Sequence, residues 1–182
     1  MGKINPVKKV KLFCGIIGRN SEIISRARNE LIPLLGSIDH ESEVFQFDFT
    51  DYYTAEMGAG LLRQFVSFAE PGDPRKLAEI KLATNDIEDK FAVTIDGRTI
   101  RTVNLDPGYI TAANLILATT KDFAHRICIG DGIYAEVTLN FRKSGLVFFD
   151  WTYPDFKSGK YTPFFMETRR RYMEEIPQSA RS

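Results

Sequence analysis

Two Asp-Gly pairs, at residues 96–97 and 131–132, each separate two runs of alternating apolar and polar residues. An Asp-Gly pair favours the tight two-residue turn between antiparallel strands, because both turn positions need a positive φ angle. The flanking runs therefore predict two β-hairpins, and a third turn follows at 143–145. The strands predicted in this half are 93–95, 99–105, 126–129, 133–142 and 146–150. A chain built in this way favours an antiparallel sheet over a doubly wound parallel one, which needs regular β-α alternation.

The first half alternates strands with helices. Asn20 or Ser21 can cap a helix that ends at Gly36, and Asp73 can cap a second helix that begins at Pro74. The predicted strands around these helices are 7–17, 44–49, 61–69 and the first strand of the hairpin half. This β-α-β-β-α-β order is that of the ferredoxin-like fold.

The remaining elements are less sharply defined by the sequence. Residues 106–109, Asp-Pro-Gly-Tyr, are expected to interrupt the chain, because proline and glycine favour turns. Residues 111–118 fit a short helix, with a strand as the competing interpretation, and 160–176 predict a final helix. The sequence thus predicts a single α+β domain over 5–176. Its sheet is mainly antiparallel, with a ferredoxin-like first part and added hairpins, and residues 1–4 and 177–182 are frayed ends.

Charge and composition narrow the function classes. The 182 residues carry 24 Lys and Arg against 24 Asp and Glu, so a net charge of zero disfavours general nucleic-acid binding. No apolar run approaches the length of a membrane-spanning helix, and the N-terminal segment does not have the pattern of a signal peptide. Cytoplasmic localisation is the resulting expectation. Cys14 and Cys128 both lie within apolar runs, which predicts two buried, reduced thiols.

An acidic and aromatic segment follows the predicted strand 44–49. Asp48, Asp51 and Glu56 lie within nine residues of one another at this strand end. Carboxylate oxygens are the ligands that Mg²⁺ prefers, so these three residues are candidate metal ligands. The alternative is that the aspartates cap turns through hydrogen bonds to the backbone.

A second polar group surrounds Pro107. Asn104 and Asp106 can orient the hydroxyls of a ligand on which Tyr109 stacks, or the whole segment can be an ordinary turn. Between Gly15 and Ser21 the chain has glycines before a helix, but no Gly-Lys-Ser/Thr of a Walker loop.

A third group spans the second Asp-Gly hairpin. Lys121, His125 and Arg126 place three basic side chains just before one strand, and Tyr134 and Glu136 lie on the polar side of the next. This side can face solvent or form the floor of a cleft. In a cleft His125, Glu136 and Asp106 are the candidate acid–base residues, since the imidazole pKa is ordinarily near neutrality. Arg126 and Lys121 would bind an anion, with Tyr134 beside them.

The aromatic residues gather in two windows. Sixteen of the 22 lie at 45–68 or 148–172. The segment from Trp151 to Phe156 can cap the core or form an apolar pocket wall, which makes Trp151 a candidate ligand-binding residue.

Several strings together resemble a known family. They are 10–13 (VKLF), 48–53 (DFTDYY), 56–58 (EMG), 104–109 (NLDPGY), 125–127 (HRI), 131–139 (DGIYAEVTL) and 151–155 (WTYPD). The chain resembles, over about residues 5–176, a bacterial domain-of-unknown-function family, number 4416. The resemblance implies little chemistry: some relatives carry a GTP-binding label, but this sequence has neither a Walker loop nor an Asn-Lys-x-Asp string.

Two functional hypotheses follow. The first is a binding or enzymatic domain for a nucleotide or another small phosphorylated ligand, with Mg²⁺ as a candidate cofactor. The second is a non-catalytic protein-interaction module that uses residues 151–156 and the C-terminal helix. The sequence does not decide whether the protein is an enzyme.

Overall fold

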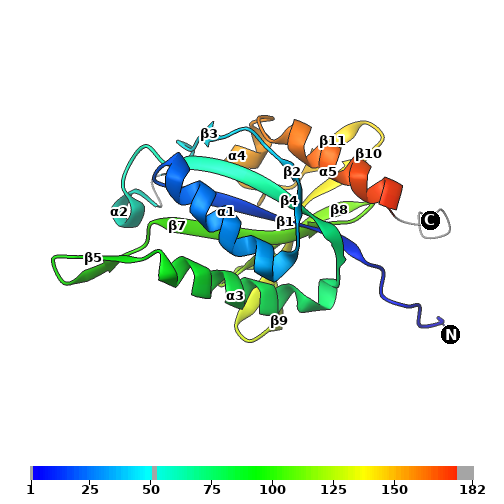
Figure 1. Ribbon diagram of the computed structural model, residues 1–182. Helices are drawn as coiled ribbons and strands as arrows, with labels where there is room; N and C mark the ends of the chain where they lie inside the picture. Colours follow the sequence, from blue (N-terminus) through cyan, green and yellow to red (C-terminus); the bar gives the residue numbers. More distant parts are fainter. Residues whose placement is uncertain (1, 51–52, 176–182) are drawn as a thin grey trace.

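The computed structural model describes residues 2–50 and 53–175, and in these ranges nine strands form one sheet (Figure 1). The main path runs β11-β10-β8-β7-β1-β4-β2, and every neighbouring pair in it is antiparallel. The short strands β3 and β9 pair with β4 and β10, and β5 and β6 form a separate hairpin. The strands are β1 Val10–Gly18, β2 Ile38–Glu41, β3 Phe45–Gln46, β4 Leu62–Gly72, β5 Val93–Ile95, β6 Arg98–Ile100, β7 Val103–Ile110, β8 Asn114–Thr119, β9 Ile127–Gly130, β10 Ile133–Arg142 and β11 Gly145–Phe148.

The helices lie on both sides of this sheet. They are α1 Ser21–Leu35, α2 Thr54–Met57, the 3₁₀ helix η1 Pro74–Lys76, α3 Leu77–Lys90, α4 Pro154–Lys157 and α5 Thr162–Glu175. As predicted, the Asn20 side chain accepts a hydrogen bond from the N–H of Ile23, and Asp73 caps η1 through the N–H of Arg75. Gly36 ends α1 with a φ of 96°, which glycine adopts without strain.

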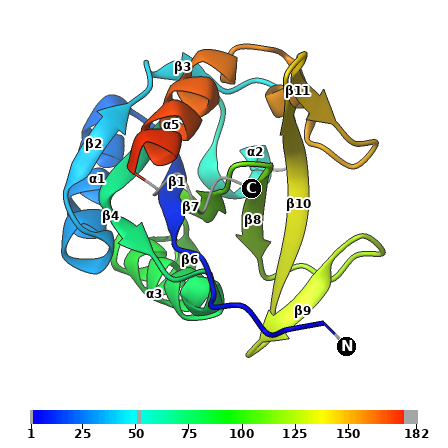
Figure 2. The same ribbon diagram turned by 90° about the vertical axis from the view of Figure 1, so that its right-hand side faces the viewer.

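A β-α-β-β-α-β unit in the order of the ferredoxin-like fold is present, formed by β1, α1, β2, β4, α3 and β7. Its second and fourth strands are β2 and β7 and not the predicted 44–49 and 93–95, which correspond to the short β3 and β5. β1 and β2 lie on opposite sides of β4, and β7 lies on the other side of β1. α1 and α3 cover one face of this unit, and α5 covers the other (Figure 2). The prediction of a single α+β domain with a mainly antiparallel sheet is therefore confirmed.

All nine residues of β1 are buried, because helices cover both faces of the strand. Leu12, Cys14 and Ile16 pack beneath α1 and α3, whereas Phe13 packs beneath α5 among aromatic side chains. The aromatic core on the α5 side includes Phe65, Phe156, Tyr161, Phe164 and Phe165. Within the described ranges, eight of the sixteen aromatic residues of the two windows are thus buried core residues.

Three expectations about the elements are wrong. Residues 106–109 do not interrupt the chain, because they continue β7. Residues 111–118 contain strand β8 and not a helix. The strand expected at 44–49 is only the two-residue β3, and the structure has in addition β2 at Ile38–Glu41, which sequence patterns did not predict.

The cysteines differ from each other. Both are free, and Cys14 is buried, but Cys128 is exposed on β9. The expectation that Cys128 is buried is therefore wrong; β9 pairs only with β10, so its apolar side chains remain uncovered. Residue 176, the expected end of the last helix, lies outside the described residues. None of the helices in the described ranges is long and apolar enough to cross a membrane.

Candidate functional site

The sheet splits between β7 and β8. The two strands pair only from Gly108 opposite Leu117 to Ile110 opposite Leu115, although β7 begins five residues earlier and β8 continues to Thr119. The ladder therefore ends next to Pro107, which has no N–H to donate. Gly108 allows the last close approach, since a Cβ there would lie 2.3 Å from the carbonyl oxygen of Ile116.

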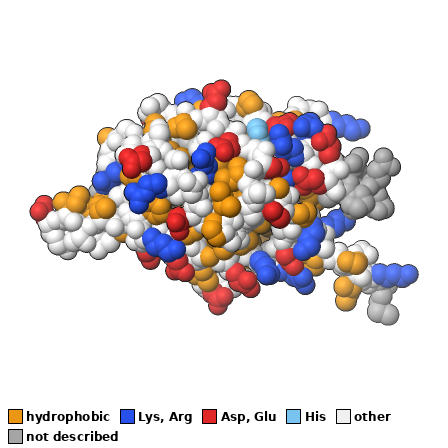
Figure 3. All heavy atoms as spheres, viewed as in Figure 1, with side chains coloured by type: hydrophobic (Ala, Val, Ile, Leu, Met, Phe, Trp, Pro, Cys, Tyr) orange, Lys and Arg blue, Asp and Glu red, His pale blue; other side chains and the backbone are white. Residues whose placement is uncertain are grey.

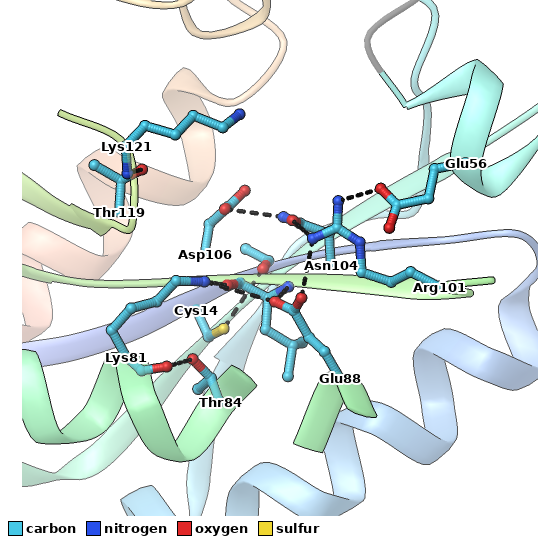
Figure 4. Close-up of polar contacts among 12 residues, drawn as sticks. Cys14, Glu56, Lys81, Thr84, Glu88, Arg101, Asn104, Asp106, Thr119 and Lys121 are labelled. Carbon is cyan, nitrogen blue, oxygen red and sulfur yellow. Dashed lines mark hydrogen bonds and ion pairs between the residues drawn. The ribbon is translucent and has the colours of Figure 1, made fainter. Parts of the chain in front are cut away.

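Two side chains of α3 replace the missing partner strand. The N–H of Leu105 donates to Glu88 Oε1 at 2.7 Å, and Lys81 Nζ donates to the carbonyl of Leu105 at 2.7 Å (Figure 4). Both side chains are at least nine-tenths buried, and Lys81 Nζ lies 3.6 Å from Glu88. The backbone N–H and C=O of Leu105 thereby form hydrogen bonds without β8, so the split can stay open.

The split contains a cavity of about 440 Å³. Its lining combines charged and aromatic side chains from both sides of the split. The charged residues are Arg63, Lys81, Arg101, Lys121, Glu88, Asp106, Glu136 and Asp155, and the aromatic residues are Phe47, Phe49, Tyr53, Tyr153 and Phe156. A cavity of this size and composition is typical of a small-molecule site.

Arg63 is the buried centre of one wall. Its guanidinium donates to Asp155 at 2.7 Å and to Asp106 at 3.1 Å, and it lies 4.7 Å from the ring centroid of Phe65. Burial alone would lower the pKa of Arg63, but the two carboxylates raise it above its usual value. Burial raises the pKa of Asp155 despite the attraction of Arg63. The two aspartates share one arginine but differ in exposure, since the Asp155 side chain is 5% exposed and that of Asp106 is 25% exposed.

A second arginine connects the cavity floor to α2. Arg101 donates to Glu88 at 3.1 Å, to Asn104 at 3.1 Å and to Glu56 at 2.8 Å (Figure 4). Asn104 in turn donates to Asp106 at 2.9 Å. Polar contacts thus run without a break from α2 along β7 to Arg63, and they fix the orientation of Asp106.

Glu136 closes the opposite wall. Its carboxylate accepts hydrogen bonds from Arg126 at 2.8 Å and from Thr138 at 3.2 Å, and it lies 3.1 Å from His125 Nε2. Arg126 also donates to the hydroxyl of Tyr153. His125 and Arg126 therefore act on the cavity through Glu136 and Tyr153 and do not line it themselves.

The structure brings together four residues that the sequence singled out. Asn104, Asp106, Lys121 and Glu136 line the cavity, and His125 and Arg126 lie directly behind Glu136.

The segment 151–156 lines the cavity through Tyr153, Pro154, Asp155 and Phe156, but the aromatic candidates that were named singly lie elsewhere. Trp151 stacks on His125 at 5.1 Å and donates to the carbonyl of Val137 at the edge of β10. Tyr109 packs against the core clusters, and Tyr134 lies on β10; neither lines the cavity.

The three candidate metal ligands are not gathered by the described part of the chain. Asp48 is exposed, Glu56 pairs with Arg101, and Asp51 lies outside the described residues. Within the described ranges, no group of three or more His, Cys, Asp or Glu side chains could hold a metal ion.

Five charged lining residues were not among the predicted site residues: Arg63, Lys81, Glu88, Arg101 and Asp155. A signal for three of them exists in the sequence. Arg63 lies between Leu61 and Phe65 on the same side of a strand, since every second residue faces that side. Lys81 and Glu88 lie at helical spacing from Leu77, on the same face of α3. A charge within an otherwise apolar strand or stripe is expensive to bury and so indicates a specific partner.

The chain was compared with known proteins at three levels. Neither the search of curated proteins nor the search of solved structures found a match. The model of the domain of unknown function DUF4416 matches residues 8–172, which covers the sheet and nearly all of its helices. The chain therefore belongs to the DUF4416 family, as its sequence strings predicted.

Proposed function

We propose that this chain binds a nucleotide or another small phosphorylated molecule in the β7–β8 cavity. The observation that carries the proposal is the joint presence of aromatic rings and Lys and Arg side chains around one enclosed volume of about 440 Å³. Aromatic rings offer a surface for a flat base, and ammonium and guanidinium groups bind phosphate oxygens. Asp106 reaches this volume from β7, and Lys121 reaches it from the segment that follows β8 (Figure 4).

The charges around the cavity support a small ligand over a long polyanion. Four cationic and four anionic side chains line it. On the face of the molecule in Figure 3, Lys and Arg side chains lie among Asp and Glu side chains and are not gathered in one basic stripe. Nucleic-acid binding would favour such a stripe.

The burial of the aromatic windows favours this proposal over a protein-interaction module. Phe156 of the 151–156 segment and Phe164, Phe165 and Tyr172 of α5 are at most 4% exposed. These side chains hold α4 and α5 on the sheet, which leaves Trp151, Tyr153 and Met166 as the large apolar side chains of this region that are exposed to a partner. The proposal concerns binding. Asp106 and Glu136 line the cavity and remain the candidate acid–base residues, with His125 behind Glu136.

Thermal unfolding with added ligands tests the proposal. Nucleoside phosphates, ribose 5-phosphate and inorganic phosphate would each be added with and without Mg²⁺. A ligand at a hundred times its Kd stabilises by about 2.7 kcal/mol. For a chain of this length that corresponds to a rise in Tm on the order of 5–10 °C.

Two lysine variants locate the binding. Lys121→Met should reduce the rise in Tm, whereas Lys143→Met, in the exposed turn between β10 and β11, should leave it unchanged. Absence of any rise with every probe, or an equal rise in both variants, would contradict the proposal.

A further inference from the structure

Asp106 is the most accessible carboxylate of the cavity. Its side chain is 25% exposed, against 7% for Glu88, 5% for Asp155 and 1% for Glu136. A ligand that needs a carboxylate acceptor would therefore reach Asp106 before the other three. It lies in the part of β7 that pairs with β1 but not with β8, which puts it at the floor of the split.

The contacts of Asp106 leave acceptor capacity on both oxygens. Asn104 donates to Oδ1 at 2.9 Å and Arg63 donates to Oδ2 at 3.1 Å. Each carboxylate oxygen can accept a second hydrogen bond. Arg63 already supplies a positive charge next to the carboxylate, and Lys121 and Arg101 line the same cavity. These cations disfavour a cationic ligand group at Asp106 and favour a neutral donor such as a hydroxyl.

Neutral polar side chains surround the same place. Asn85 comes from α3, and Thr119 and Thr120 come from the end of β8. If the β7–β8 ladder continued, Thr119 would lie opposite Asp106, but the strands diverge there and the cavity lies between them. A ligand in the split therefore meets a carboxylate on one strand and hydroxyls on the other, next to the rings of Phe49 and Tyr53.

We infer that Asp106 accepts hydrogen bonds from the vicinal hydroxyls of a sugar, so that the ligand is a phosphorylated molecule with a ribose-like ring. A carboxylate that reads ribose hydroxyls is a well-known arrangement in nucleotide sites of other folds. The inference rests on the proposed function, and it adds that the cavity recognises the sugar of the ligand through its hydroxyls.

Calorimetric titration of the wild-type protein tests the inference without any variant. The matched probes are ribose 5-phosphate against 2-deoxyribose 5-phosphate, and adenosine monophosphate against its 2′,3′-dideoxy form, with inorganic phosphate as the reference. A lost hydrogen bond to a charged acceptor should weaken binding about tenfold or more for each deoxy probe.

Two variants assign the preference to one side chain. Asp106→Asn should bring the affinity ratio between the hydroxylated and deoxy probes close to one. Asp89→Asn, on the exposed side of α3, should preserve the ratio. If Asp106→Asn does not fold, the wild-type ratio still decides.

The two possible failures can be told apart. Binding of phosphorylated probes with equal affinity for hydroxylated and deoxy forms would overturn the inference and leave the proposed function standing. Absence of binding by every phosphorylated probe would overturn both.

Discussion

Lys11 shows how a single residue ties three elements together. Its side chain on β1 is fully buried, and its ammonium contacts Asp39 of β2 at 2.8 Å and Glu175 of α5 at 2.6 Å. A buried ammonium is tolerated only with carboxylate partners, because its desolvation is otherwise uncompensated. Asp39 is fixed in turn by Ser67 at 2.7 Å. These contacts hold α5 and the edge strand β2 against the centre of the sheet.

Asp39→Asn should lower the free energy of unfolding at pH 7 by about 1–3 kcal/mol, because buried Lys11 loses one charged partner. Burial opposes the ionisation of Asp39, but hydrogen bonds from Lys11 and Ser67 outweigh it and hold the Asp39 pKa below its usual value. The carboxylate's stabilisation is therefore complete above the unfolded-state pKa of about 3.9 and is lost as pH falls through the lower folded-state pKa.

Urea unfolding of the wild type and Asp39→Asn at several pH values from 7 down to 2 checks this. The difference between the two proteins should shrink in acid. A difference that stays constant or widens would show that Asp39 does not stabilise through its charge.

At the scale of elements, the replacement of a strand by a helix is the feature that makes the cavity. Lys81 and Glu88 of α3 satisfy both backbone groups of Leu105, so β7 can end its pairing with β8 early. Lys81→Met should therefore leave the Leu105 carbonyl without its donor and cost about 1–3 kcal/mol. Lys90→Met, which loses only an exposed contact to Glu30, should cost less than about 0.5 kcal/mol.

Chemical denaturation of the two lysine variants measures this difference. Amide hydrogen exchange at Leu105 adds a local readout, because its N–H should lose protection in Lys81→Met before the rest of β7. Equal stability of the two variants would mean that Lys81 does not support the free strand edge.

Local chemistry explains which elements the sequence could predict. Asp96 and Asp131 have positive φ angles of 49° and 52° and precede glycines that also have positive φ, so both hairpins follow from their turn residues. The break expected at Pro107 failed for a tertiary reason. Proline lacks only the N–H that would point to β8, and β8 is not paired there, so β7 continues through it.

The candidate site was predictable only in part for a similar reason. Asn104 and Glu136 are polar residues in predicted strands, and Asp106 stands out as a carboxylate next to Pro107. Asp155 is recognisable only through its partner Arg63, which is distant in the chain. The spacing of Lys81 on α3 indicates a buried charge, but its partner Leu105 is also distant. Trp151 is a candidate because it is aromatic, but its indole N–H donates a hydrogen bond to the carbonyl of Val137 in β10, and Trp151 does not line the cavity.

At the scale of the whole molecule, the rates at which the two thiols react measure how readily the sheet unfolds. Cys14 lies at the centre of β1 and is fully buried, and burial raises its pKa well above the ordinary value. Cys128 is exposed on β9. A thiol reagent should therefore modify one equivalent quickly in the native protein and the second only at the rate of global unfolding.

Stopped-flow thiol titration checks this expectation. Cys128→Ser should remove the fast phase and preserve the slow one, and denaturant should merge the two phases in the wild type. Two fast equivalents in the native protein would show that the central strand is accessible without global opening.

The burial of β1 on both faces also affects how fast the chain can fold. Its partners come late in the sequence: Lys11 pairs with Pro71 in β4 and with Ile110 in β7. The central strand cannot complete its ladders until segments far along the chain have closed upon it, which gives the fold a high contact order. Sheets with such non-local pairing fold in milliseconds to seconds, much more slowly than helical bundles of equal stability.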